Sequence, residues 1–218
     1  MRSVGFAISG QHYLFDVQSF AHTILAQGGD GFHYALLDRT TQGVIDDVSE
    51  GTSELGVVVV TSAKEPVLAS AFEEAGLEFK ELATSAPRVA LPSSHPLVNA
   101  KELELEQLAD HPYVYFAQEP DAPLAFYEEA LSDVERAKSI ACTDRATLTE
   151  LIMAINGYTV TSGILVGITD GSALTTIPLK TDVVLRLGYL ARKGEALSPM
   201  AERFAAHLQR CLDYYANR

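Results

Sequence analysis

The sequence predicts an α/β fold of two lobes, joined by two crossover segments and separated by a cleft. Strand-like apolar runs alternate with amphipathic helical segments up to Leu82, and a second alternation begins at Arg88. Near the C-terminal end, two strand-like runs are separated by the polar trio Lys180-Thr-Asp182, which suits a return between lobes. Alternating strands and helices indicate a parallel sheet with helices on its faces. We expect residues 1–84 with 182–218 to form lobe I and residues 85–181 to form lobe II.

The first lobe begins with a buried strand and an amphipathic helix. The helix is expected to bury Leu14, Val17, Phe20, Ile24 and Leu25, which recur at helical spacing and are followed by glycines. The uninterrupted apolar run Leu55–Val60 is typical of a parallel strand covered on both faces. The strands expected in lobe I are Val4–Ile8, Phe32–Leu37, Leu55–Val60, Leu77–Leu82 and Val183–Leu190, and the later helices lie around Val44, Ile45 and Val48, at Glu65–Ala75 and at Ser198–Tyr214.

The second lobe begins at Arg88 with a strand that Pro92 and Pro96 close, because proline lacks the backbone donor that a central ladder needs. An acidic amphipathic helix is expected next, with Leu103, Leu105 and Leu108 on its apolar side. The remaining expected elements are strands at Tyr113–Phe116, Ser139–Cys142, Tyr158–Val160 and Thr175–Leu179, and helices at Ala122–Leu131 and Thr147–Ile155.

Composition excludes several classes of function. A chain of 218 residues with 47% hydrophobic residues can bury a large core. Its formal charge of -13, from 16 Lys and Arg against 29 Asp and Glu, argues against binding DNA by itself. We expect a cytoplasmic location, since neither a signal peptide nor a membrane span is evident. Cys142 and Cys211 are far apart and belong to no metal-ligand pattern, so we expect ordinary thiols, no metal and no cofactor.

The segment RVALPSSHPLVNAKELELEQLADHPYVYF, from Arg88 to Phe116, resembles the middle of the effector-binding domain of LysR-type transcriptional regulators. Thr40-Thr41, Glu54-Leu55-Gly56 and Ile152–Tyr158 match looser motifs of that family, while Ile155 and Ser162-Gly163 depart from it. The resemblance implies a type 2 periplasmic-binding-protein-like fold, a small organic acid (a carboxylate) held between the lobes, and control of transcription through the geometry of a homodimer or tetramer. DNA would be contacted only through a winged helix-turn-helix head, which we expect to be absent from this sequence.

The effector site is expected at the carboxyl ends of the strands, where ligands of open α/β sheets gather. Ser and Thr side chains both donate and accept hydrogen bonds, and glycine lets backbone amides approach a ligand closely. Ser9, Thr41 and Thr143 would equally serve as helix N-caps without any ligand. The candidate effector-binding residues are Ser9, Gly10, Gln11, Thr40, Thr41, Thr61, Ser62, Phe116, Ala117 and Gln118.

Four further residues and one helix have alternative interpretations. His12 and His33 are expected at the edge of the cleft, as packing histidines or as titrating ligand sensors. His95, in the His-Pro-Leu turn, is expected to serve the fold. Arg145 could bind an acidic effector, although pairing with Asp144 is favoured. The helix Gln11–Gln27 is a candidate surface for self-association, since the resemblance implies an oligomer.

Two other functions fit a bilobed fold. A small-molecule enzyme is not expected, because the sequence has no catalytic motif: no Gly-x-Ser-x-Gly turn, no HExxH and no clustered acidic ligands. A solute-binding protein of a transport system would share the architecture, and the missing export signal argues against it. The interpretation favoured by the sequence is therefore a regulatory sensor without catalytic residues.

Overall fold

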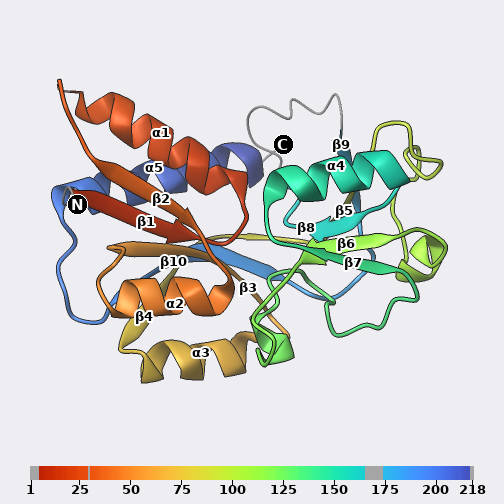
Figure 1. The fold of residues 1–218 in the computed structure, drawn as a ribbon, viewed down its shortest axis with the longest axis horizontal. Coiled ribbons are helices and arrows are strands. Elements are labelled where there is room, and N and C mark those ends of the chain that lie inside the picture. Colours follow the sequence, from red (N-terminus) through yellow and green to blue (C-terminus); the bar gives the residue numbers. More distant parts are fainter. Residues whose placement is uncertain (1–4, 29, 165–173, 217–218) are drawn as a thin grey trace.

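A computed structural model describes residues 5–28, 30–164 and 174–216 and shows two parts side by side (Figure 1). We call the part built on a five-stranded sheet, with strand order β2-β1-β3-β10-β4, lobe I. Lobe II contains a three-stranded sheet of order β8-β5-β9 and a two-stranded sheet of β6 and β7. The chain passes from lobe I to lobe II between β4 and β5, and it returns between β9 and β10. These passages lie close to the boundaries expected at residues 84 and 182. The division of the chain into lobes at those two residues remains a proposal.

Lobe I follows the predicted order of elements. Its strands are β1 (Phe6–Gly10), β2 (Tyr34–Asp38), β3 (Leu55–Thr61), β4 (Leu77–Ser85) and β10 (Leu185–Arg192), and its helices are α1 (Leu14–Gln27), α2 (Thr41–Ser49), α3 (Glu65–Glu74) and α5 (Pro199–Ala216). Val4, expected to begin the first strand, lies outside the described residues.

The sheet of lobe I is mixed. Strands β1, β2 and β3 are parallel, as the alternating pattern predicts, whereas β10 runs antiparallel to both β3 and β4. All seven residues of β3 are buried, which confirms a strand covered on both faces. A Cβ atom at Gly188 of β10 would lie 2.1 Å from the carbonyl oxygen of Lys80, so only glycine fits at this crossing.

Helices α1 and α5 cover one face of this sheet, and α2 and α3 cover the other (Figure 1). The predicted buried side of α1 is wrong in part: Phe20 is buried, but Leu25 is 77% exposed. The buried face instead includes the polar residues Ser19 and Thr23, whose hydroxyls donate to backbone carbonyls one turn earlier at 2.6 and 2.8 Å. Polar side chains with such local partners can be buried at little cost.

Lobe II contains the expected strands but fewer helices than expected. Its elements are β5 (Arg88–Pro92), η1 (Leu105–Leu108), β6 (Tyr113–Phe116), η2 (Leu124–Phe126), β7 (Ser139–Cys142), α4 (Arg145–Ile155), β8 (Thr159–Thr161) and β9 (Leu174–Pro178). The acidic segment forms only a single 3-10 turn, although Leu103 and Leu108 are buried. The helix predicted over Ala122–Leu131 is wrong, because only η2 forms there.

Helix α5 is attached to lobe I at its first turn. The carboxylate of Glu54, which precedes β3, accepts hydrogen bonds from the backbone N–H and the hydroxyl of Ser198 at 2.6 and 2.8 Å. An acidic group at this end also complements the helix dipole. Among the described helices, none combines the length and apolar character that crossing a membrane requires.

Candidate functional site

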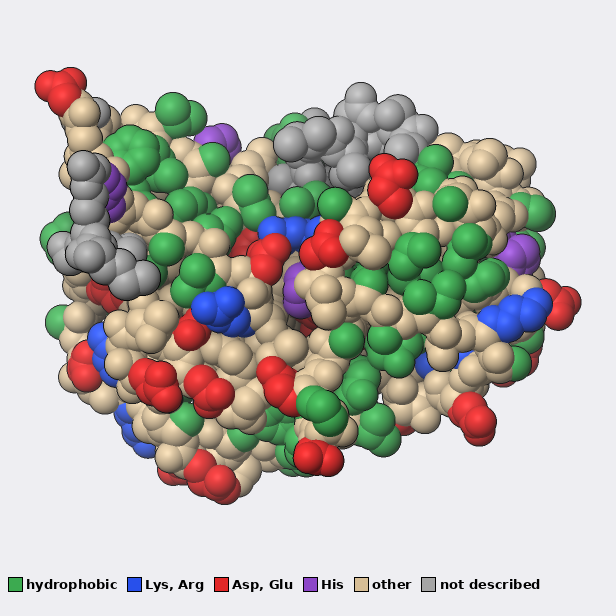
Figure 2. All heavy atoms as spheres, viewed as in Figure 1, with side chains coloured by type: hydrophobic (Ala, Val, Ile, Leu, Met, Phe, Trp, Pro, Cys, Tyr) green, Lys and Arg blue, Asp and Glu red, His purple; other side chains and the backbone are tan. Residues whose placement is uncertain are grey.

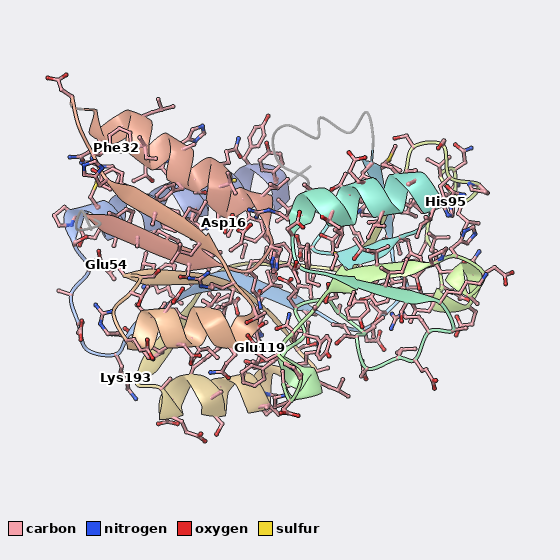
Figure 3. All side chains as sticks on the ribbon, viewed as in Figure 1. Asp16, Phe32, Glu54, His95, Glu119 and Lys193 are labelled. Carbon is pink, nitrogen blue, oxygen red and sulfur yellow. The ribbon has the colours of Figure 1, made fainter. Side chains whose placement is uncertain are left out.

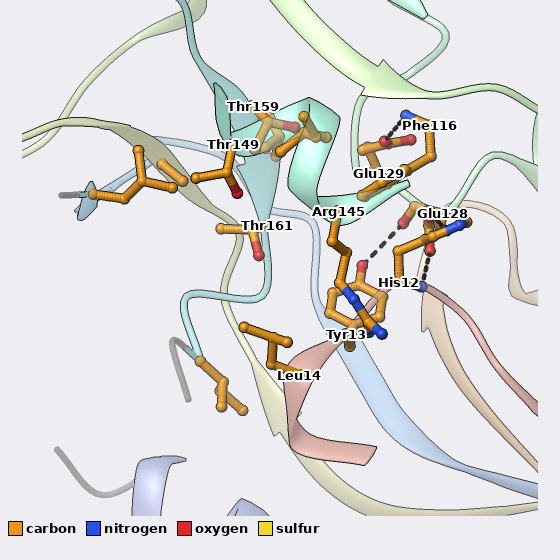
Figure 4. Close-up of a pocket in the computed structure, with 15 residues that line it drawn as sticks. His12, Tyr13, Leu14, Phe116, Glu128, Glu129, Arg145, Thr149, Thr159 and Thr161 are labelled. Atoms are coloured by element: carbon orange, nitrogen blue, oxygen red, sulfur yellow. Dashed lines mark hydrogen bonds and ion pairs between the residues drawn. The ribbon is translucent and has the colours of Figure 1, made fainter. Parts of the chain in front are cut away.

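A pocket lies between the two lobes, with a cavity volume of about 100 Å³ (Figure 4). Lobe I contributes the loop between β1 and α1, and lobe II contributes most of the apolar wall. Figure 2 shows acidic, basic and histidine side chains gathered in the middle of this face, where the lobes meet. The lining residues are His12, Tyr13, Leu14, Ala90, Phe116, Glu128, Glu129, Arg145, Leu148, Thr149, Thr159, Val160, Thr161, Ile164 and Leu174.

His12 of lobe I pairs with Glu128 of lobe II at one side of this pocket. The Nδ1 atom of His12 lies 2.7 Å from Glu128 Oε1, and the backbone N–H of His12 donates to Glu128 Oε2 at 3.0 Å. The imidazole stacks on Phe116 with 4.0 Å between ring centroids. Burial lowers the pKa of His12, but the hydrogen bond and charge of Glu128 outweigh burial and raise the pKa overall. The pair therefore favours protonated His12 and links the lobes.

Glu129 is a buried carboxyl group in the pocket wall. Its Oε1 accepts a hydrogen bond from the backbone N–H of Phe116 at 2.6 Å. Its Oε2 has no hydrogen-bond partner in the described part of the chain. Burial raises the pKa of Glu129 to about 8, and the charge of Glu128 acts in the same direction. At pH 7 Glu129 is therefore mainly protonated, and it can donate a hydrogen bond from its unpartnered oxygen.

Lys64, just before α3, extends from lobe I into the loop that carries both glutamates. Its ammonium group donates to the carbonyl oxygens of Tyr127 and Glu129 at 2.6 and 2.9 Å and to the hydroxyl of Ser132 at 2.7 Å. Burial lowers the pKa of Lys64 to about 8, although the charge of Glu129 opposes this. With three acceptors around one ammonium group, Lys64 fixes this loop against lobe I.

Arg145, the first residue of α4, reaches from lobe II to lobe I. Its Nη2 donates to both carboxylate oxygens of Asp38 at 2.8 Å. Its Nη1 lies 3.8 Å from Asp16 Oδ1 and has no hydrogen-bond partner among the residues described. The favoured pairing with Asp144 is wrong, because the Asp144 side chain caps α4 by accepting from the backbone N–H of Thr147 at 2.9 Å. Arg145 thus has one nitrogen anchored and one available.

The predicted residues at the end of β1 are used within lobe I. The hydroxyl of Ser9 bonds to Asp47 at 2.5 Å and to Ser53 at 2.7 Å, so Ser9 caps no helix. A Cβ atom at position 10 would lie 2.2 Å from Asp16 Oδ2, so a residue with a side chain would clash there and glycine fits. The side chain of Gln11 donates to the Thr41 hydroxyl at 2.6 Å and accepts from the Val59 backbone at 2.7 Å.

Other predicted residues form a contact between the lobes next to the pocket. The hydroxyl of Thr40 donates to Glu119 at 2.5 Å, and the backbone N–H of Thr41 donates to the Gln118 side chain at 3.3 Å. Figure 3 shows Glu119 at this junction and Asp16 above it. The N-cap of α2 is Thr40 and not Thr41, because the Thr40 hydroxyl accepts from the backbone N–H of Gly43 at 3.2 Å.

The remaining members of the predicted set lie apart from the pocket lining. Thr61 is buried and lines a separate hollow beside Lys64. The hydroxyl of Ser62 accepts from the backbone of Val184 at 3.1 Å, and the backbone N–H of Ala117 donates to Cys142 O at 2.8 Å. Phe116 is therefore the member of the predicted set that lines the pocket.

The histidine expectations have mixed outcomes. His33 precedes β2, at the end of the sheet opposite the junction, so its expected place at the cleft edge is wrong. Its neighbour Phe32 marks that remote position in Figure 3. The structural role expected for His95 is confirmed, because the ring is buried, accepts from Leu97 at 3.1 Å and lies 3.1 Å from His111.

The two cysteines are buried thiols within the described part of the chain. Cys142 and Cys211 are both buried and free, and burial raises the pKa of each thiol to about 11. A thiol with a raised pKa contains little of the nucleophilic thiolate at neutral pH. Across the part of the chain that the structure describes, no group of His, Cys, Asp and Glu is arranged to hold a metal ion.

Sequence reasoning missed Lys64, Glu128 and Glu129. Lys64 and Glu128 make polar contacts between the lobes, and Glu128 and Glu129 line the pocket. The two glutamates fall within the helix that the sequence predicts over Ala122–Leu131, and the pattern did not mark them as site residues. Lys64 had no distinguishing local signal.

Comparisons with known proteins are consistent with this architecture. The model of the family described as "LysR substrate binding domain" matches residues 30–212. No match was found among curated protein sequences.

Solved structures of LysR-type regulators share the fold at low sequence identity. Oxidized OxyR of Corynebacterium glutamicum is 16% identical with a TM-score of 0.65, and the match covers 98% of this chain and 66% of that one. The effector-binding domain of QuiR, solved with shikimate, is 13% identical with a TM-score of 0.59, and 99% of each chain is covered. The reduced OxyR regulatory domain of Pseudomonas aeruginosa is 15% identical with a TM-score of 0.67, covering 94% and 95%. Such identities establish the fold and leave the ligand open.

Proposed function

The chain belongs to the LysR substrate-binding domain family, and we propose that it senses a small organic acid held in the pocket between its lobes. The family consists of effector-binding domains of transcription regulators with the type 2 periplasmic-binding-protein-like fold, and it is not in general catalytic. This assignment favours a sensor over the solute-binding and enzymatic alternatives.

The observation that supports this proposal best is a pocket whose wall comes from both lobes. A ligand between two lobes contacts both only when they are close, so it binds the closed arrangement more tightly. Unequal affinity for two arrangements is what a ligand needs in order to shift their populations. The lobe I side of the pocket is His12 to Leu14, and the lobe II side comes from β5, β6, β8 and α4.

Direct polar contacts between the lobes surround the same pocket. His12 contacts Glu128, Thr40 contacts Glu119, and Arg145 contacts Asp38. The proposed role of Thr40, Thr41 and Gln118 is to form this contact surface, and Gln11 supports it from within lobe I through the Thr41 hydroxyl. Phe116 is proposed to contact the effector. For Ser9, Gly10, Thr61, Ser62 and Ala117, effector binding remains a prediction.

Regulation is proposed to follow from the arrangement of the lobes within an oligomer. LysR-type regulators usually form oligomers, and DNA would be contacted by a separate head domain. A change in the interlobe arrangement would then alter the relative positions of such heads. The exposed side of α1, which includes Leu25, is the proposed surface of self-association.

An oxidant-sensing function is the second candidate, because two similar structures are described as OxyR in an oxidized form and as an H2O2-bound OxyR mutant. The chain has two cysteines, and burial raises the pKa of both thiols. Peroxide reacts with a thiolate, so these thiols are poorly suited to the reaction. The structure favours reversible ligand binding over thiol oxidation.

A thermal-shift screen of small organic acids tests the proposed function, since a ligand that binds only the folded form raises its melting temperature. Thr149→Phe, which fills the pocket from α4, should abolish any shift. Ala146→Phe, at an exposed position of the same helix, is the matched control and should preserve it. A shift that Thr149→Phe leaves unchanged would place the ligand elsewhere and refute the interlobe site.

A further inference from the structure

We infer that Glu129 selects the ligand of the interlobe pocket by donating a hydrogen bond to a small monocarboxylate, which Arg145 holds by its second nitrogen. This inference rests on the proposed function and specifies the ligand class and the recognising groups. It is carried by two unpartnered buried polar atoms, by the size of the cavity and by the balance of charge around it.

Two polar atoms of the pocket residues are buried without a hydrogen bond among the described residues. They are Glu129 Oε2, from the loop after η2, and Arg145 Nη1, from the start of α4. Buried polar atoms normally have partners, because an unpaired group costs about 1–3 kcal/mol. A carboxylate in the pocket carries the acceptor oxygens that these two donors lack, which neither an alkane nor an alkylammonium ion does.

The protonation state of Glu129 depends on charged groups from every neighbouring element. Burial is the largest cause of its pKa of about 8, and the charge of Glu128, beside it in the same loop, also disfavours ionisation. Hydrogen bonds from the backbone N–H groups of Phe116 and of Glu129 itself, and then the charge of Lys64 of lobe I, favour ionisation. Tyr13 and Tyr113 also feel its charge, and burial raises the pKa of both phenols, so both are neutral.

Cys142 is a third neutral neighbour of Glu129, because burial raises its pKa to about 11. Near neutral pH the carboxyl group of Glu129 is therefore protonated and can donate a hydrogen bond.

The charged side chains around the pocket pair with one another when no ligand is bound. Protonated His12 is balanced by Glu128, and Arg145 by Asp38. Asp16 lies 3.8 Å from Arg145 Nη1 but is mainly protonated at pH 7, because burial raises its pKa to about 8. A cationic ligand would enter beside two cations and would have to ionise Glu129. A dianion would bring one charge more than Arg145 can share with Asp38. A monoanion is the charge that the free nitrogen of Arg145 can accommodate.

The cavity limits the body of the ligand. Its volume is about 100 Å³, whereas a cavity that binds benzene is about 150 Å³. The rest of the wall is mostly apolar and includes Leu148, Val160 and Leu174, with Thr149, Thr159 and Thr161 also lining it. The ligand class that fits is a short aliphatic monocarboxylate, smaller than the six-membered ring of the shikimate bound by QuiR.

The test is isothermal titration of the whole chain with acetate, propionate, butyrate and hexanoate, with propionamide and propylamine as neutral and cationic probes. We expect propionate or butyrate to bind most tightly and propylamine not to bind. These acids stay ionised from pH 6 to 10, so the pH dependence reports the protein. Affinity should be level below pH 8 and should fall about tenfold per pH unit above it, as Glu129 ionises.

Glu129→Gln separates this mechanism from other titrating groups. The amide keeps an oxygen to accept from Phe116 and a donor for the ligand, so binding should persist with a smaller loss of affinity above pH 8. The loss that remains would come from Lys64 and Asp16, whose pKa values are also about 8. Glu135→Gln, an exposed position of the following loop, is the matched control and should retain the wild-type pH dependence.

An unchanged pH dependence in Glu129→Gln, or preferred binding of propylamine, overturns the inference. If larger acids bind in a manner that Thr149→Phe abolishes while the short acids do not bind, the inference fails and the proposed sensor function stands. If no acid of any size binds, the proposed function fails.

Discussion

Replacing Asp16 by Asn should stabilise the protein at neutral pH. Asp16 lies on the buried face of α1, where its Oδ1 accepts from the backbone of Val17 and its Oδ2 has no hydrogen-bond partner among the described residues. Burial raises the pKa of Asp16 from 3.8 to about 8, against the opposing charge of Arg145. The folded state therefore binds a proton that the unfolded state releases, and stability falls as the pH rises from about 4 to 8.

The size of the effect follows from this window. At 1.36 kcal/mol per pH unit, keeping Asp16 protonated at pH 7 costs about 4 kcal/mol. Asn carries no such cost, and for a chain of this size the gain corresponds to roughly 10 °C in melting temperature. Urea denaturation of both proteins from pH 4 to 9 measures it: the stability difference should be small at pH 4 and grow until pH 8. Asp46→Asn, at an exposed position of α2, should show no such trend.

A stability difference that does not vary with pH would refute this reasoning. That result would mean that Asp16 is ionised in the folded state and that Arg145, whose Nη1 lies 3.8 Å from Asp16 Oδ1, compensates for its burial. The same titration would then report Arg145 as fully engaged with lobe I.

Three further predictions concern the contacts between the lobes and the end of β1. Lys64→Met removes the donor to three acceptors, of which Glu129 is buried and Tyr127 and Ser132 are half-buried, and should cost about 2–4 kcal/mol in urea denaturation, with faster hydrogen exchange in the loop of Glu128. Gly10→Ala should cost about 2–4 kcal/mol because the new Cβ meets Asp16, and the double variant with Asp16→Gly should recover most of this loss. His12→Phe keeps the ring stacking but not the ion pair, so it should cost about 1–2 kcal/mol at pH 6. Because the pKa of His12 is raised, that difference should shrink as the pH rises through the folded pKa, and a constant difference would exclude the pair.

Local patterns predicted most of the fold but not the interlobe contacts. The run Leu55–Val60 is apolar throughout because both faces of β3 are covered, so composition and structure agree there. Helix α1 was placed correctly, yet its buried face was not, because Ser19 and Thr23 satisfy their hydroxyls on the helix itself. Hydrophobic periodicity cannot detect a polar residue that finds its partner one turn away.

The helix predicted over Ala122–Leu131 failed for a reason outside that segment. A helix would use the carbonyl oxygen of Tyr127 to accept from the backbone N–H of Leu131, whereas here Lys64 donates to that oxygen and also to the carbonyl oxygen of Glu129. The local sequence gives no indication that Lys64, 63 and 65 positions before Tyr127 and Glu129, will donate to their carbonyl oxygens. Tertiary contacts of this kind override helix propensity.

In the proposed sensor, the loop that carries Glu128 and Glu129 would connect lobe closure to ligand recognition. Lys64 and His12 hold its backbone and its first carboxylate against lobe I, while its second carboxyl group faces the pocket. A ligand that engages Glu129 would therefore bind best when the loop is already held by lobe I. Opening the lobes would release Lys64 and His12 and loosen the group that recognises the ligand. This arrangement supports a sensor in which closure and occupancy stabilise each other, since both depend on one loop of lobe II.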